Sequence, residues 1–71
     1  MSDKSDMIDL LRSKLEKNGF SGLTNDDIMH HLKAAINNEF AGDNIGMTIY
    51  GLLEGELSYM ATEIEEIVER C

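Results

Sequence analysis

Two adjacent histidines are the residues in this sequence best suited to metal binding or proton transfer. His30 and His31 are neighbours. Consecutive side chains on a helix point about 100° apart, so these two cannot both face one metal ion. Asp26 with His30, and Asp27 with His31, do have the i, i+4 spacing of a ligand pair. Two ligands are too few to specify a zinc site, so we expect no metal here.

No other group of residues predicts catalysis. The order of side chains matches neither a Ser-His-acid triad nor a Cys-His pair, and no glycine-rich phosphate loop follows a strand. A chain of 71 residues also leaves little room for both a core and a preorganised pocket. We therefore expect a protein that is not an enzyme and has no cofactor. Only a dimer is expected to build a pocket, around His30, His31 and Glu39.

One short turn resembles a known family. An acidic helical chain of this size with an Asp-x-hydrophobic turn at the start of a helix is similar to the acyl carrier proteins, here at Asp43-Asn44-Ile45. The resemblance covers these few residues. It implies a serine at the middle position, which in that family carries the phosphopantetheine arm. Asn44 stands there and cannot accept this group, so the sequence argues against carrier activity.

The composition indicates one small all-α domain spanning residues 1–71. The chain is 42% hydrophobic and 28% charged, which is apolar enough to fold. It contains no proline, and the spacing of its apolar residues favours helices over strands. A core this small lies near the lower limit for stability, and a single cysteine excludes an internal disulfide. Association with another chain is the expected source of extra stability.

The formal net charge of −8 restricts the partners. Direct binding to a nucleic-acid backbone or to an anionic membrane needs Lys and Arg to neutralise phosphates. The first residues have no basic segment followed by an apolar stretch, and no span of 18 apolar residues occurs. We therefore expect a cytoplasmic protein that binds a protein with a basic surface, and neither nucleic acid nor a membrane.

Local signals predict the first two helices. The first is expected at about residues 5–18 and should end where Gly19 can adopt the left-handed conformation. The second is expected at about residues 25–40. Thr24 with Asp27 at the third helical position matches a capping box, which fixes the start of this helix.

A heptad register dominates the last third of the chain. Its seam residues alternate at spacings of 4 and 3: Gly46, Tyr50, Leu53, Leu57, Met60, Ile64, Ile67 and Cys71. This register predicts one long helix over about residues 45–70, roughly 39 Å long at 1.5 Å per residue. Gly51 and Gly55 each cost roughly 1 kcal/mol inside a helix. A break near Gly55 is the alternative.

The length of this third helix predicts a homodimer. The two shorter helices can cover about half of its seam, and each large apolar side chain left in water forfeits roughly 1.5 to 3 kcal/mol. A second copy would cover the rest, with Cys71 available for an interchain disulfide in a parallel dimer. Leu52 and Tyr59 lie off the seam, so they are either exposed contacts or packed against the shorter helices. The expected dimer seam is Tyr50, Leu53, Leu57, Met60, Ile64 and Ile67.

Acidic residues are concentrated near the end of the third helix. Four of them are Glu63, Glu65, Glu66 and Glu69. In an up-down-up bundle the cations of the first helix, Arg12, Lys14 and Lys17, would lie at the same end and could pair with them. The alternative is that these glutamates dock a basic partner.

These observations favour a small acidic interaction module. We expect a non-enzymatic adaptor, inhibitor or regulatory subunit that self-associates through the third helix and binds a macromolecular partner through Glu63, Glu65, Glu66 and Glu69. The alternative is a nucleic-acid mimic that blocks the basic groove of a DNA- or RNA-binding protein. A mimic needs carboxylates at intervals along an extended surface, whereas here they lie at one end, so we rank it second.

Overall fold

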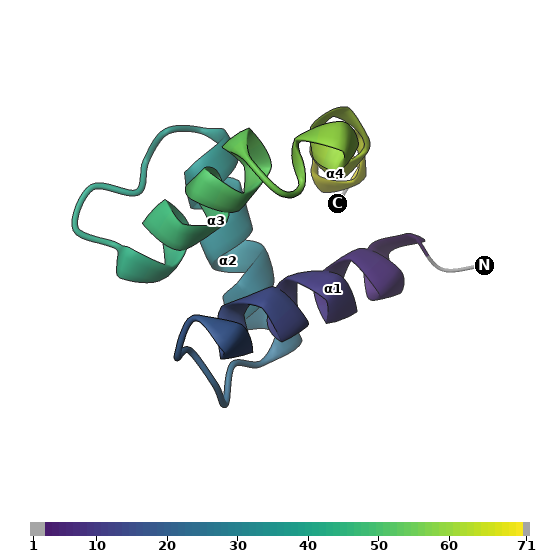
Figure 1. Ribbon diagram of the computed structural model, residues 1–71. Helices are drawn as coiled ribbons and strands as arrows, with labels where there is room; N and C mark the ends of the chain where they lie inside the picture. Colours follow the sequence, from purple (N-terminus) through teal and green to yellow (C-terminus); the bar gives the residue numbers. More distant parts are fainter. Residues whose placement is uncertain (1–2, 71) are drawn as a thin grey trace.

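The computed structural model describes residues 3–70, which form four α-helices and one short 3₁₀-helix (Figure 1). The elements are α1 (Asp3–Lys17), α2 (Asn25–Ile36), α3 (Asn44–Glu54), η1 (Ser58–Met60) and α4 (Ala61–Glu69). No strand occurs among the described residues, so the all-α prediction is confirmed. The radius of gyration, 10.9 Å, is close to the value of about 11 Å expected for a compact chain of this length.

The first helix ends as the sequence predicts. The Phe20 amide donates to the Leu15 carbonyl at 2.9 Å, and the Gly19 amide donates to the Glu16 carbonyl at 3.1 Å. These two bonds, with Gly19 at φ +91°, form a Schellman motif. They satisfy two of the carbonyls that the last turn of α1 leaves unpaired.

The second helix begins as predicted but ends earlier. The capping box is present, because the Asp27 amide donates to Thr24 Oγ1 and the Thr24 amide donates to Asp27 Oδ2, each at 3.1 Å. The expected range of 25–40 is wrong at its end. A second Schellman pattern stops α2 at Ile36, with Asn38 at φ 57° as the left-handed residue. The Glu39 amide completes it by donating to the Ala34 carbonyl at 2.7 Å.

The prediction of one helix over 45–70 is wrong, because the segment folds into α3, η1 and α4. The molecule's longest dimension, 31 Å, is shorter than the roughly 39 Å that such a helix needs. The chain turns after Glu54, where the Leu57 amide donates to the Leu52 carbonyl at 2.7 Å. Gly51 and Gly55 make this the weakest stretch of the predicted helix. The turn places Leu57 in the core, 2% exposed.

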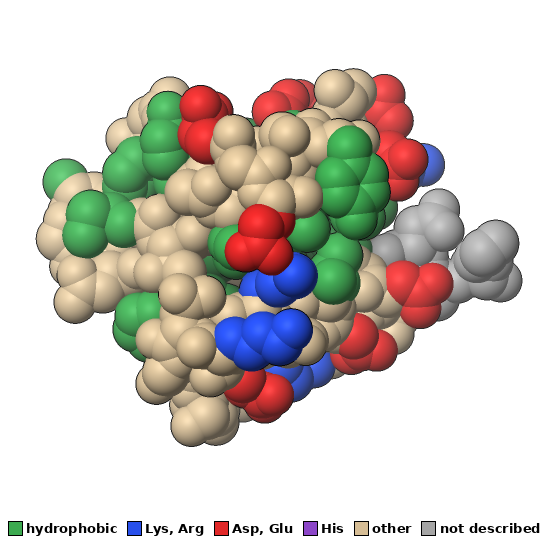
Figure 2. All heavy atoms as spheres, viewed as in Figure 1, with side chains coloured by type: hydrophobic (Ala, Val, Ile, Leu, Met, Phe, Trp, Pro, Cys, Tyr) green, Lys and Arg blue, Asp and Glu red, His purple; other side chains and the backbone are tan. Residues whose placement is uncertain are grey.

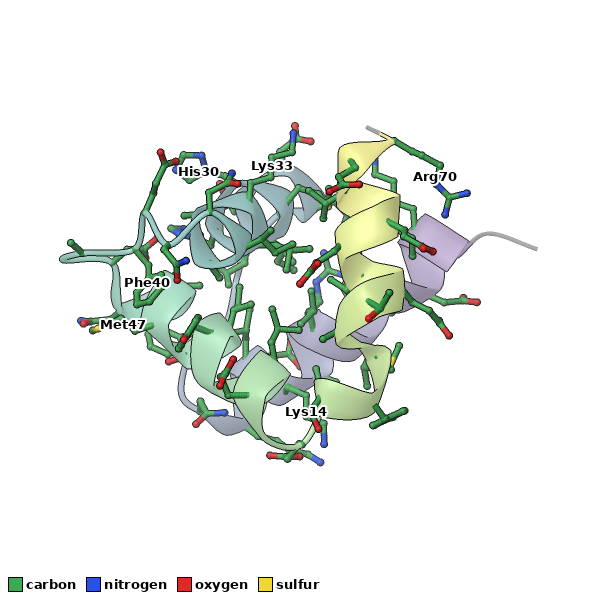
Figure 3. The ribbon with its side chains drawn as sticks, turned by 90° about the horizontal axis from the view of Figure 1, so that it is seen from above. Lys14, His30, Lys33, Phe40, Met47 and Arg70 are labelled. Carbon is green, nitrogen blue, oxygen red and sulfur yellow. The ribbon has the colours of Figure 1, made fainter. Side chains whose placement is uncertain are left out.

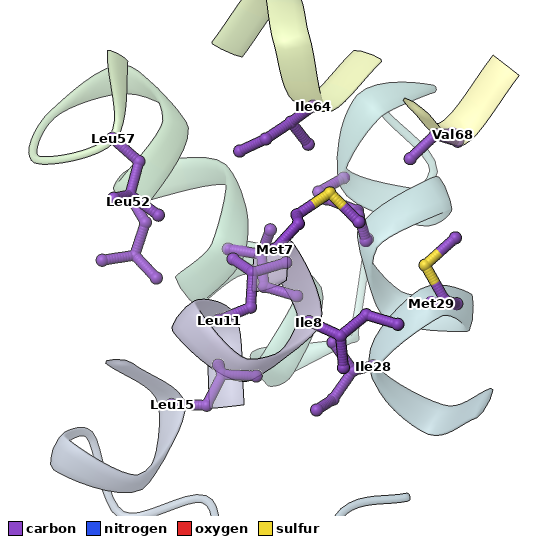
Figure 4. Packing of buried hydrophobic residues seen from close by; sticks show 13 residues of the cluster. Met7, Ile8, Leu11, Leu15, Ile28, Met29, Leu52, Leu57, Ile64 and Val68 are labelled. Atoms are coloured by element: carbon purple, nitrogen blue, oxygen red, sulfur yellow. The ribbon is translucent and has the colours of Figure 1, made fainter. Parts of the chain in front are cut away.

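The core lies between α1, α2, α3 and α4 (Figure 4). Ile64 and Val68 point from α4 toward the apolar residues of α1 and α2. Ile64 is completely buried and Val68 is 9% exposed, within a single chain. The uncovered seam from which a homodimer was predicted therefore does not exist in this form. The buried apolar residues are Met7, Ile8, Leu11, Leu15, Ile28, Met29, Leu32, Ala35, Ile49, Leu52, Leu57, Ile64 and Val68.

Candidate protein-interaction surface

The residues assigned to the dimer seam do not share one surface. Leu57 and Ile64 are core residues. Leu53, Met60 and Ile67 are half-buried and pack against the core from α3, η1 and α4 respectively. Tyr50 is 38% exposed and points outward from α3. Cys71 lies outside the described residues.

The four glutamates assigned to partner binding do lie together. Glu63, Glu65, Glu66 and Glu69 are all exposed on α4. Acidic side chains gather around this helix in the space-filling view, at the upper right of Figure 2. Among residues 3–70, none of the four forms an ion pair with a Lys or Arg side chain.

Two cations of α1, Arg12 and Lys14, are engaged away from α4. Lys14 Nζ donates to Glu56 Oε1 at 2.6 Å, which joins α1 to the turn after α3. Arg12 pairs with Asp9 at 3.3 Å and also donates to Asn25. The Lys14 contact lowers the pKa of Glu56 from its ordinary value of 4.5. The expectation that these cations neutralise the α4 glutamates is therefore wrong.

A groove beside these glutamates separates α4 from α1. It has a volume of about 240 Å³. On the face seen in Figure 2, hydrophobic side chains are exposed between the region of α4 and that of α1, with acidic side chains on both sides. The groove is lined by Asp6, Met7 and Leu10 of α1, by Met60 of η1, and by Glu63, Ile64 and Ile67 of α4.

A second cleft, of about 630 Å³, lies between α2 and the loop that leads to α3. Its lining includes His30, His31 and Glu39, so one chain brings together three residues that were expected to form a pocket only in a dimer. The rings of His30 and His31 meet edge to face, with centroids 5.2 Å apart. Figure 3 shows His30 and Lys33 pointing outward at this edge of α2.

His31 contacts Asp43, which the sequence did not predict as its partner. His31 Nδ1 donates to Asp43 Oδ2 at 2.6 Å, since an ionised carboxylate only accepts. Asp43 Oδ1 accepts the Gly46 amide at 3.1 Å and so caps α3. Burial on its own raises the pKa of Asp43, but the bonds from His31 and Gly46 outweigh it and lower this pKa below its ordinary value of 3.8. The expected neighbour, Asp27, is occupied by the capping box.

One contact in this second cleft has a structural role, because it joins two helices. The residues that line the cleft include no hydroxyl or thiol side chain that could act as a nucleophile. Within residues 3–70, no group of three or more His, Cys, Asp or Glu side chains is placed to hold a metal ion. The imidazole of His31 is held by Asp43 and ties α2 to the start of α3.

An uncharged apolar patch covers the outer side of α3. We define the α3 patch as Phe40, Met47 and Tyr50. The Phe40 and Tyr50 rings are stacked, 4.8 Å apart and inclined by 30°, and Met47 is 45% exposed. Figure 3 shows Phe40 and Met47 at the same edge of the molecule, away from α4. Phe40 was expected within the second helix, but it lies in the loop after α2.

The two apolar residues expected off the seam have different environments. Leu52 is 7% exposed and belongs to the core, whereas Tyr59 in η1 is 78% exposed. Tyr59 is thus the residue of this pair with surface available for a contact.

Comparison of the chain with models of protein families, with curated proteins and with solved structures finds no match. None of the helices within residues 3–70 combines the length and the apolar character needed to cross a bilayer.

Proposed function

We propose that this chain is a non-enzymatic interaction module that binds a basic surface of another protein through the exposed glutamates of α4. One observation carries the proposal. Glu63, Glu65, Glu66 and Glu69 are exposed on one helix, without an ion pair to Lys or Arg within residues 3–70. An adaptor, an inhibitor or a regulatory subunit would all use such a surface.

The position of these charges on the helix supports a basic partner. The C-terminal turn of a helix carries a partial negative charge, and each anion there costs about 0.3 to 1 kcal/mol. The last turn of α4, with Glu66 and Glu69, contains no basic residue within the helix. A cationic partner offsets this repulsion when it binds. Complementary charge also accelerates encounter, which makes association sensitive to salt.

Nucleic-acid mimicry remains the second hypothesis. The seven residues from Glu63 to Glu69 cover about 9 Å along a helix axis, at a rise of about 1.5 Å per step. Duplex DNA instead presents phosphates continuously along each strand, about 3.4 Å apart along its axis. A short acidic helix suits a local basic patch better than a long basic groove.

The length of a single third helix no longer supports self-association, but the exposed α3 patch does. Copies with a net charge of −8 repel one another except where a surface lacks charge. The three side chains of the α3 patch carry no charge, and the one charged residue within α3 is Glu54 at its last position. We expect Met47→Glu to lower any concentration-dependent rise in mass measured by light scattering. An unchanged dimer would place the interface elsewhere.

Capture from a lysate of the native host tests the main proposal. Wild type is compared with a variant in which Glu63, Glu65, Glu66 and Glu69 are changed to Gln. The matched control carries four exposed carboxylates from other surfaces changed to Gln: Glu16, Asp26, Glu39 and Glu54. Both variants change the net charge by the same amount. We expect the α4 variant alone to lose its basic partner. Equal capture by both variants would overturn the proposal.

A further inference from the structure

The groove between α1 and α4 continues along α4 into two further hollows. The next hollow, of about 300 Å³, shares Glu63 and Ile67 with the groove and adds Glu66 and Arg70. A third, also about 300 Å³, shares Glu66 and Arg70 and adds Glu69. We refer to the three together as the α4 trough. It runs from an apolar end beside α1 to an acidic end at the last turn of α4.

The apolar end is suited to a single large side chain. Met7 and Ile64 form buried walls of the groove, while Leu10, Met60 and Ile67 are half-buried along it. Half-buried apolar residues gain further stabilisation when a ligand removes them from water, at about 25 cal/mol per Å². A volume of about 240 Å³ accommodates one aliphatic or aromatic anchor. Asp6 and Glu63 flank this position with negative charge.

The acidic end fixes the charge and the direction of the occupant. Glu63, Glu66 and Glu69 follow one another at i, i+3 spacing, so they form one row along α4. Counted from Met60, Glu63, Glu66 and Glu69 lie three, six and nine residues farther along α4, which is about one to two and a half helical turns. A helical ligand lying along the trough would therefore present Lys or Arg about four and seven residues from its anchor. The same carboxylates disfavour anionic membranes and nucleic acids.

We propose that the α4 trough binds an amphipathic basic segment of a partner protein, with one large apolar anchor between α1 and α4 and with cations along the glutamate row. This inference rests on the proposed function and names the kind of partner it requires. The groove supplies an anchor site, and the carboxylates on its edges and beyond it determine which peptides fit.

Arg70 already occupies part of the acidic end. It lines both outer hollows, and its Nε donates to the Glu66 carbonyl at 3.3 Å. Figure 3 shows its side chain at the end of α4. Within residues 3–70, no carboxylate lies within ion-pair distance of its guanidinium. Its positive charge nevertheless repels an incoming cation, so removing it should tighten binding.

Selection from a display library of random 14-residue peptides tests this inference, with wild-type protein as bait. We expect the selected peptides to contain one large apolar residue, with Lys or Arg one and two helical turns to one side of it.

The affinity of one selected peptide is then measured for wild type and for each variant. Met60→Ser with Ile67→Ser should weaken binding at least tenfold, as should Glu63→Gln with Glu66→Gln. Arg70→Gln should strengthen binding about threefold. Glu16→Gln with Glu54→Gln, exposed on α1 and α3, is the charge-matched control and should change nothing.

The outcomes separate this inference from the proposed function. Selected peptides that are basic but lack an anchor, and that depend on the glutamates alone, overturn the anchor site and leave the proposed function standing. Apolar peptides that need neither Glu63 nor Glu66 overturn both. Failure to enrich any sequence overturns the trough as a peptide site, while the capture experiment still decides the proposed function. Circular dichroism of each variant confirms that it is folded before its affinity is interpreted.

Discussion

His31 and Asp43 join the middle of α2 to the start of α3 through one carboxylate. Asp43 Oδ2 accepts from His31 Nδ1 at 2.6 Å, while its other oxygen accepts the Gly46 amide. The two residues are half-buried, with side-chain exposures of 21% and 22%, so water competes only partly for these bonds. Asp43 therefore adds a polar link to the apolar packing that already holds α2 against α3.

Replacing this carboxylate should destabilise the fold. Asp43→Ala loses both the helix cap and the bond from His31, and we expect a loss of about 2 kcal/mol in the free energy of unfolding. Asp43→Asn should lose less, because Asn also caps helices well. Urea denaturation measures both changes. Glu16→Gln, on the exposed side of α1, is the control. Equal stability of wild type and Asp43→Ala would show that this joint contributes nothing.

The contribution of Asp43 should disappear in acid. Because its pKa in the folded chain lies below 3.8, the unfolded chain binds more protons than the folded chain at acid pH. The contribution is thus complete above this ordinary pKa and is lost as the pH falls through the folded-state pKa. The stability difference between wild type and Asp43→Asn should shrink over that range. Taking the difference removes the effect of the other carboxylates, and a difference that stays constant would contradict the prediction.

The packing of α4 predicts opposite results for two lysine substitutions. Ile64→Lys introduces a charge at a completely buried site, and we expect the chain to unfold. Met60→Lys, at the half-buried edge of the groove, should leave the helices intact because its ammonium group can reach water. Circular dichroism distinguishes the two. A folded Ile64→Lys variant with native helix content would show that α4 does not pack on α1 and α2 as described.

Alanine substitution at two glycines of α3, Gly46 and Gly51, should change the stability of the protein in opposite directions. A Cβ at Gly51 would meet no atom within 4 Å, so Gly51→Ala should stabilise the protein by about 0.5 to 1 kcal/mol through helix propensity. A Cβ at Gly46 would lie 2.8 Å from Phe40 Cβ and 2.9 Å from Asp43 Oδ2. Gly46→Ala should therefore destabilise it, despite the same gain in propensity. Thermal unfolding measures both, and shifts of the same sign would contradict the packing of Phe40 on α3.

Signals confined to a few neighbouring residues predicted structure well. The Thr24 capping box and the Gly19 stop specify their helix ends through bonds between residues three to five positions apart. The stop at Asn38 uses the same pattern as Gly19. It was missed because asparagine adopts the left-handed conformation less readily than glycine.

The heptad register predicted the structure of the last third of the chain less well. Spacings of 3 and 4 continue through Gly55, because α3 and α4 each have an apolar face and the turn between them happens to preserve the count. The sequence cannot show that Leu57 and Ile64 are covered by α1 and α2, since this depends on contacts between distant segments. The His31 contact with Asp43 spans 12 positions and has no local signal either. The sequence alone did predict one part of the site, the exposed position of Glu63, Glu65, Glu66 and Glu69.

The position of Val68 in the core has a consequence for protein synthesis. Ribosomes make the chain from its N-terminus, so α1, α2 and α3 are complete before α4 can cover them. Until Ile64 and Val68 have been added and have emerged, the nascent chain exposes the apolar side chains of Met7 and Met29 against which α4 will pack. Such transient surfaces favour aggregation and recruit chaperones. The apolar surface that α1, α2 and α3 form together is therefore covered only after α4 has been made and has docked.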